Sequence, residues 1–151
     1  MLKQILKSLY RRDLEKLKLE IDSYKDESKI WSVEKDVTNS AGNLTLHLIG
    51  NLNAFIGAEI GKTYYVRQRE LEFSSKNIAK NELVQMIDDT LTVVENALDS
   101  MADEQFNEEY PLIVFTEKMM NGYFLTHLAT HLAYHLGQIN YHRRLLDAQE
   151  N

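Results

Sequence analysis

The chain has 151 residues and a net charge of −6, so its length fits one domain and its charge disfavours binding to a phosphate backbone. It contains no cysteine, which excludes a disulfide bond and a thiolate metal site and leaves histidine, carboxylate, amide or water as metal ligands. No apolar run approaches the roughly 20 residues of a membrane-spanning helix, so we expect one cytoplasmic domain over residues 1–151 that binds neither nucleic acid nor a membrane.

Apolar periodicity predicts four helices, because apolar residues recur at helical intervals in four separate segments. The first segment starts at Leu2, and its apolar stripe ends near Tyr24. The second follows residues 38–40, Thr-Asn-Ser, which are all good N-cap residue types. It should end near Gly61, since glycine is favoured just after a helix.

The second predicted helix carries an unusual row of glycines along one face, Gly50, Gly57 and Gly61. An interior glycine costs a helix about 1 kcal/mol relative to alanine, so the row needs a reason. Close approach of another helix would supply one, either within the bundle or across a dimer interface. A different face of the same helix is expected to form its core contacts, through Leu44, Leu48, Leu52, Phe55 and Ile56.

The middle of the chain alternates between irregular and helical patterns. Residues 62–79 are too mixed for periodicity, and we expect an ordered crossover loop there. A third helix is predicted over residues 80–101, with Asn81 as its cap. A linker over residues 102–116 follows, in which residues 110–115 are expected to form a short extended segment.

A fourth helix is predicted over residues 118–146. Four amphipathic helices with two long connections predict an all-α fold, an antiparallel four-helix bundle with long crossover connections. The alternative is a helical hairpin that dimerises into a bundle, but four separate apolar stripes make it less economical.

Histidine spacing is the most informative feature of the sequence, because four of the five histidines fall on the predicted fourth helix, at positions 127, 131, 135 and 142. Residues four apart on a helix are offset by about 40° and lie about 6 Å apart along the axis, so both imidazoles can reach one ion. His127 with His131 and His131 with His135 satisfy this geometry equally. His142 lies about 10 Å beyond His135, too far to share that ion.

A third ligand from another helix would complete a three-histidine site that keeps positions open for water or substrate. His47, on the predicted second helix, is the remaining histidine that can supply it, and it lies on a polar strip with Asn43 and Asn51. Each histidine taken alone is also compatible with a structural role, and short HxxxH pairs recur by chance. For His127 and His142 we expect a structural or exposed role.

Two segments of the chain resemble a known family. Residues 131–139, His-Leu-Ala-Tyr-His-Leu-Gly-Gln-Ile, resemble the HxxxHxGQ signature in the last helix of the DinB-like superfamily. Residues 39–52 look like its second helix, where the family carries its other metal histidine. The resemblance covers nearly the whole chain and implies that His47, His131 and His135 are the ligands, with His127 one turn outside.

The resemblance also implies a function. Members of this superfamily are commonly dimeric and hold nickel, zinc or a related divalent ion, so we expect a homodimer with one Zn²⁺ or Ni²⁺ per chain. Characterised relatives include bacillithiol S-transferases and a mycothiol-dependent maleylpyruvate isomerase. The expected activity is therefore a metal-dependent transferase that uses a low-molecular-weight thiol, and the alternatives are a metal-dependent hydrolase or a noncatalytic metal- or ligand-binding stress protein. No catalytic side chain can be named, but Asn43, Asn51 and Gln138 are candidates for contact with the substrate or the ligands.

Overall fold

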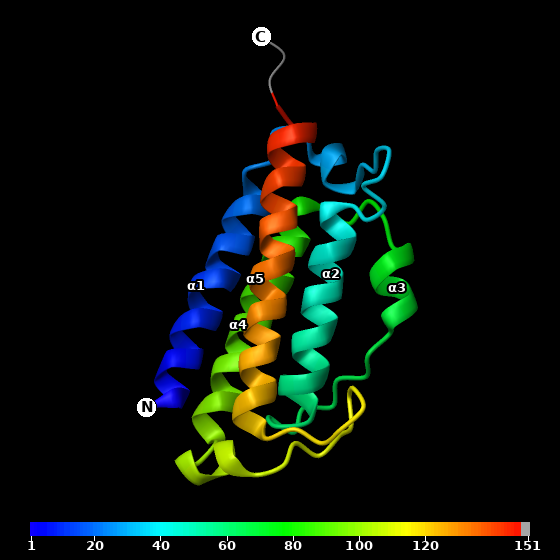
Figure 1. Cartoon of the computed structure of the whole chain (residues 1–151). Helices are drawn as coiled ribbons and strands as arrows, with labels where there is room; N and C mark the ends of the chain where they lie inside the picture. The colour runs from blue at the N-terminus through cyan, green and yellow to red at the C-terminus, as the bar shows by residue number, and fades with distance from the viewer. Residues whose placement is uncertain (149–151) are drawn as a thin grey trace.

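The computed structural model describes residues 1–148, and these residues are largely helical (Figure 1). The prediction of an all-helical protein is confirmed. Within the described residues, β-structure is limited to two isolated bridges, Glu34 with Val37 and Glu109 with Met120. The α-helices are α1 (Leu2–Asp22), α2 (Ala41–Leu52), α3 (Arg69–Ser74), α4 (Lys80–Ser100) and α5 (Asn121–Leu146). Shorter helical turns are the 3₁₀ segments η1 (Glu27–Trp31) and η3 (Asp103–Asn107) and the π segment η2 (Asn53–Ala58).

The four long helices lie side by side around one core (Figure 1). Helices α1 and α5 run in one direction and α2 and α4 in the other. Helix α1 packs on α4 and α5, α2 packs on α4 and α5, and α3 packs on the outside of α2. Each long helix contributes fully buried apolar side chains to the core, such as Leu14, Leu48, Val94 and Leu132. No helix within residues 1–148 is both long and apolar enough to cross a membrane.

Helix α2 begins at the predicted position because Ser40 caps it. The Ser40 hydroxyl accepts a hydrogen bond of 3.1 Å from the backbone N–H of Asn43, which satisfies a free donor in the first turn. All residues from Ala41 to Leu52 are buried, because α4, α5, α3 and η1 surround the helix. The helical path continues through the π turn to Ala58, close to the predicted end near Gly61. Because α2 is enclosed on several sides, its side chains are held in fixed positions.

The glycine row of α2 and η2 is used inside the chain. A Cβ atom on Gly57 would lie 2.8 Å from the Val93 side chain of α4, and one on Gly61 would lie 3.1 Å from Ala97 of the same helix. Gly50 faces α3 instead. Of the two expected reasons for the row, close approach within the bundle is therefore the one that the structure supports.

Some local predictions are wrong. The segment 62–79 contains the short helix α3, which is too brief to show periodicity in the sequence. Asn81 does not cap α4, whose N-cap is Ala79 without a side-chain hydrogen bond. Residues 110–115 contain bends and form no strand, and α5 begins at Asn121 rather than 118.

Candidate metal centre

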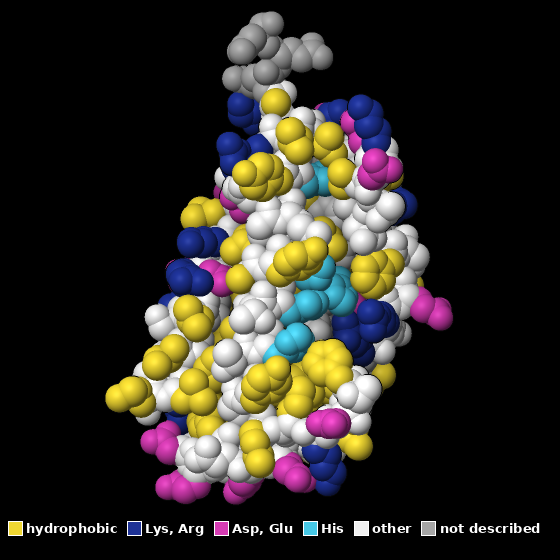
Figure 2. All heavy atoms as spheres, in the orientation of Figure 1, with side chains coloured by type: hydrophobic (Ala, Val, Ile, Leu, Met, Phe, Trp, Pro, Cys, Tyr) yellow, Lys and Arg dark blue, Asp and Glu magenta, His cyan; other side chains and the backbone are white. Residues whose placement is uncertain are grey.

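The packing of α2 on α5 brings three histidines together. His47 on α2 is 7 % exposed, and His131 and His135 on α5 are half-buried beside it. The Nε2 atom of His131 lies 3.2 Å from Nε2 of His47 and 3.1 Å from Nε2 of His135. Figure 2 shows histidine side chains as a continuous patch at the surface of this face, next to a group of basic side chains. The three rings therefore converge at a point that solvent can reach.

The spacing of the three nitrogens fits a single divalent ion. Metal–nitrogen bonds of about 2.0–2.1 Å place two imidazole ligands of a tetrahedral or octahedral site roughly 2.9–3.4 Å apart. The observed spacings of 3.1 and 3.2 Å fall in that range. Ligand atoms from His47, His131 and His135 all lie within 4.8 Å of one another, and among residues 1–148 no further histidine or carboxylate joins this group. A bound ion would thus keep positions open for water or substrate.

Hydrogen bonds at the far side of two rings orient the nitrogens. Nδ1 of His47 lies 3.2 Å from Oε1 of Glu72, and Nδ1 of His135 lies 2.7 Å from Oε1 of Gln138. Both oxygens are acceptors, so both Nδ1 atoms donate and each Nε2 is left with its lone pair facing the centre. Nε2 of His47 and Nε2 of His135 are then both acceptors next to His131. A single N–H on His131 cannot satisfy both of them well. A cation at the centre satisfies all three rings.

Arg67 and Glu72 form a buried ion pair behind His47. Glu72 is 5 % exposed and accepts two hydrogen bonds of 2.9 Å from Arg67, from Nε to Oε2 and from Nη2 to Oε1. The Arg67 Nη2 atom also lies 3.3 Å from Nδ1 of His47, and since a guanidinium can only donate, both groups point their hydrogens at the shared carboxylate oxygen. The buried carboxylate is thus compensated by one cation and one imidazole N–H.

Burial keeps two of the clustered imidazoles, His47 and His131, in the uncharged form that a metal requires. Desolvation lowers the pKa of His131 to about 4, with help from the neighbouring His135 and His47. Desolvation also lowers the pKa of His47, and this effect outweighs the opposing hydrogen bond from Glu72. The contact between His47 and Glu72 is therefore a hydrogen bond of a neutral ring to a carboxylate, not a salt bridge, at neutral pH. Metal binding by His47 and His131 therefore does not have to displace protons at neutral pH.

The predicted polar neighbours have different positions. Gln138 contacts His135, with its Oε1 2.7 Å from Nδ1 of that ring. Asn43 lies away from the rings and donates to the backbone carbonyls of Glu72 and Ser75, at 2.9 and 2.8 Å, so it attaches α3 to α2. Asn51 is buried, and its Oδ1 has no hydrogen-bond partner among residues 1–148.

The other two histidines of α5 lie outside the cluster, as predicted. His127 packs against the ring of Phe115 and stacks beside Phe124, one turn before His131. His142 is buried, where its Nδ1 accepts a hydrogen bond of 2.7 Å from the Tyr24 hydroxyl and its Nε2 donates to the Ser32 carbonyl at 2.8 Å. His142 therefore connects α5 to the segments after α1.

Sequence reasoning missed Arg67 and Glu72. Both fall in the segment 62–79, where no periodicity assigns a face to any side chain. The one available signal is that this segment mixes two arginines, Arg67 and Arg69, with two glutamates, Glu70 and Glu72, and such a pattern is too common to be specific.

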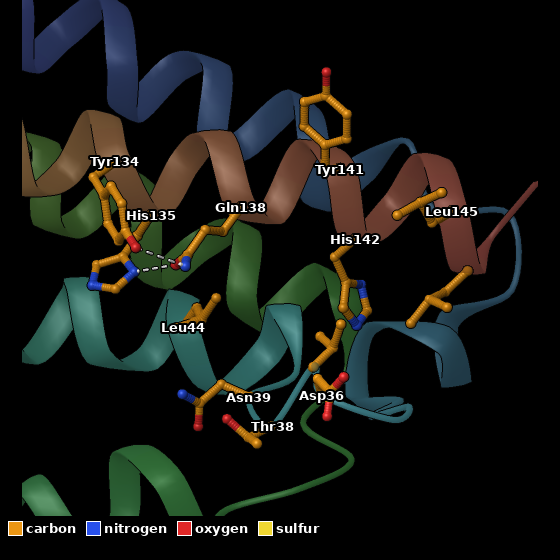
Figure 3. Close-up of a pocket in the computed structure, with 12 residues that line it drawn as sticks. Asp36, Thr38, Asn39, Leu44, Tyr134, His135, Gln138, Tyr141, His142 and Leu145 are labelled. Atoms are coloured by element: carbon orange, nitrogen blue, oxygen red, sulfur yellow. Dashed lines mark hydrogen bonds between the residues drawn. The ribbon is translucent and has the colours of Figure 1, made fainter.

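A groove begins beside His135, on the side of the ring where Gln138 contacts Nδ1. It has a volume of about 460 Å³ and runs between α5, the start of α2 and the loop at residues 36–39. Figure 3 shows His135 and Gln138 at one end and Tyr141 and Leu145 further along α5, with Asp36 on the loop opposite. Its wall combines apolar side chains with a few polar groups, the composition of a small-molecule site.

The family described as "Protein of unknown function (DUF1572)" matches the chain over residues 3–151. None of the curated proteins matches it.

Proposed function

The chain belongs to the DUF1572 family, and from its histidine cluster we propose that it binds one divalent metal ion per chain and acts as a metal-dependent transferase for a low-molecular-weight thiol. The observation that carries the metal site is the convergence of three Nε2 atoms, with that of His131 lying 3.2 Å from Nε2 of His47 and 3.1 Å from Nε2 of His135. His47, His131 and His135 would hold the ion, and Zn²⁺ and Ni²⁺ both suit imidazole ligands.

We further propose that the fold is a DinB-like four-helix bundle. The support is the resemblance of residues 39–52 and 131–139 to that superfamily, together with four long helices packed around one core. Two of the contacting pairs, α1 with α4 and α2 with α5, run in opposite directions, whereas α1 with α5 and α2 with α4 run in the same direction. Long connections after α2 and after α4 agree with a bundle that has crossovers.

The proposed reaction is inferred from the three-histidine site and from the absence of cysteine in the sequence. A divalent ion on three neutral imidazoles supplies a Lewis acid that lowers the pKa of a thiol or water reaching its open side. A free thiol of pKa about 8.5 is only a few per cent ionised at neutral pH, so this help is significant. The protein has no cysteine, so the thiol has to come from a small molecule. Gln138 holds His135 in place, and the groove beside it can position the electrophile.

Two alternatives use the same histidines. A metal-dependent hydrolase would activate water instead of a thiol, and a noncatalytic protein would use the ion to stabilise the fold or to sense a ligand. Three protein ligands favour an enzyme, because a structural site usually has a fourth protein ligand, and a groove lies next to one of the three, His135.

Metal content tests the first part of the proposal. Purified protein dialysed against metal-free buffer should retain about one divalent ion per chain by elemental analysis. His131→Ala and His135→Ala should lose it, and the matched control His127→Ala, one turn away on the same helix, should keep it. Loss in His127→Ala with retention in His135→Ala would assign the site to the other HxxxH pair.

Thiol conjugation tests the second part. Metal-loaded protein should accelerate the reaction of a chlorobimane acceptor with bacillithiol, glutathione or coenzyme A, and metal-stripped and His135→Ala protein should not. A metal-dependent hydrolysis of ester or amide substrates, with no rate for any thiol, would replace the transferase by the hydrolase. No metal-dependent rate at all would favour the noncatalytic alternative.

We also propose a homodimer, which rests on the family resemblance now that the glycine row is used within the chain. Exposed apolar side chains on α1 and α5, among them Leu2, Ile5, Tyr123 and Tyr141, offer a surface for it. Light scattering at micromolar concentration distinguishes the dimer from a monomer.

A further inference from the structure

Helix α3 buries one charged side chain against the centre. Five of its six residues are exposed, but Glu72 is 5 % exposed and contacts His47. Burying a carboxylate is costly unless it is paired and hydrogen-bonded. A short surface helix could have kept that carboxylate in water, so its inward position needs a reason.

Gly50 makes room for this carboxylate. A Cβ atom at position 50 would lie 1.9 Å from Oε2 of Glu72 and 2.6 Å from its Cδ, closer than any side chain can approach. His47 and Gly50 are three residues apart and share one face of α2, so one supplies the ring and the other the space behind it. Asn43, one turn earlier, donates to the carbonyls of Glu72 and Ser75 and fixes the end of α3. One face of α2 is thus shaped to receive α3.

We propose that Glu72 is a positioning residue of the metal centre that acts through His47, and that docking of α3 on α2 is coupled to metal binding. Glu72 Oε1 accepts the Nδ1–H of His47, which keeps the Nε2 lone pair toward the centre and makes the ring a stronger ligand. Arg67 holds the carboxylate in place through two hydrogen bonds. Because coupling is reciprocal, an ion on His47 stabilises the docked α3, and release of the ion loosens it. This inference rests on the metal-binding part of the proposed function and is independent of the reaction.

Two substitutions test it from different sides. Glu72→Gln keeps the shape and an acceptor oxygen but removes the charge. Gly50→Ala keeps every polar group but displaces the carboxylate. Gly137→Ala on α5 is the matched control, since a Cβ there meets no atom within 4 Å. Folding of each variant is checked by circular dichroism, and Zn²⁺ affinity is measured by competition with a chromophoric chelator. We expect a loss of about 10- to 100-fold in affinity for Glu72→Gln and Gly50→Ala, and no loss for Gly137→Ala.

A second measurement does not need the metal. In the metal-free protein, ¹⁵N chemical shifts should report the Nδ1–H tautomer for His47 in wild type and a tautomer mixture in Gly50→Ala. Amide hydrogen exchange should show that Zn²⁺ protects α3 in wild type and much less in Gly50→Ala.

The outcomes separate this inference from the proposed function. A folded Gly50→Ala protein with wild-type Zn²⁺ affinity and a wild-type His47 tautomer would overturn the positioning role. If wild type itself bound no Zn²⁺, the metal-binding proposal would fail, and with it the coupling of α3 to an ion. The tautomer measurement would then still decide whether Glu72 orients His47.

Discussion

Acidification of the metal-free protein should reveal the burial of His131. In the unfolded chain this imidazole has its ordinary pKa of about 6.5, whereas desolvation lowers the pKa to about 4 in the folded chain. Between these two values the unfolded state binds more protons than the folded state. The free energy of unfolding therefore rises with pH through this window. The contribution of His131 to it is fully present above about pH 6.5 and is lost as the pH falls toward about 4.

The expected size follows from the position of the ring. At about pH 5, a pKa difference of this size between the folded and unfolded chain lowers the free energy of unfolding by about 2 kcal/mol relative to neutral pH, if it acts in full. His131 is half-buried, so solvent screening reduces the expected contribution to about 1 kcal/mol. Because His47 and His142 also have lowered pKa values, only a comparison with His131→Gln isolates the effect of His131.

Urea unfolding with chelator present, followed by far-UV circular dichroism, measures this difference. Between about pH 7.5 and about pH 5, wild type should lose about 1 kcal/mol more stability than His131→Gln, whose amide does not titrate. Parallel losses in the two proteins would refute the reasoning, since they would mean that His131 takes up its proton as easily in the folded chain as in the unfolded one.

Three further outcomes are expected. Leu48→Ala removes a fully buried side chain from the most enclosed helix and should lower the free energy of unfolding by about 2–5 kcal/mol, measured by urea titration. Tyr24→Phe leaves the buried Nδ1 of His142 without its donor and should cost about 1–3 kcal/mol in the same titration, whereas an unchanged midpoint would mean that water replaces the hydroxyl. Zn²⁺ at about one hundred times its dissociation constant should stabilise wild type by about 2.7 kcal/mol, and a thermal melt of His135→Ala should not respond to the ion.

The helices and half of the centre follow from local sequence. Helix formation depends on residues three and four positions apart, so the stripes of α1, α4 and α5 and the Ser40 cap of α2 are visible without any tertiary information. The same periodicity places His131 and His135 on one face, because a helix brings them together by itself.

Tertiary structure decided the rest. On an isolated helix the pairs His127 with His131 and His131 with His135 are equivalent, and only the packing of α2 on α5 sets His47 opposite the second pair. The glycine row was ambiguous for the same reason. A small residue indicates that another helix comes close, but not whether that helix belongs to the same chain or to a second copy. Glu72 lies 25 residues from His47 in a segment without periodicity, so their contact depends on where α3 docks. A contact between segments that distant is set by the free energy of packing the whole chain, which no local pattern encodes.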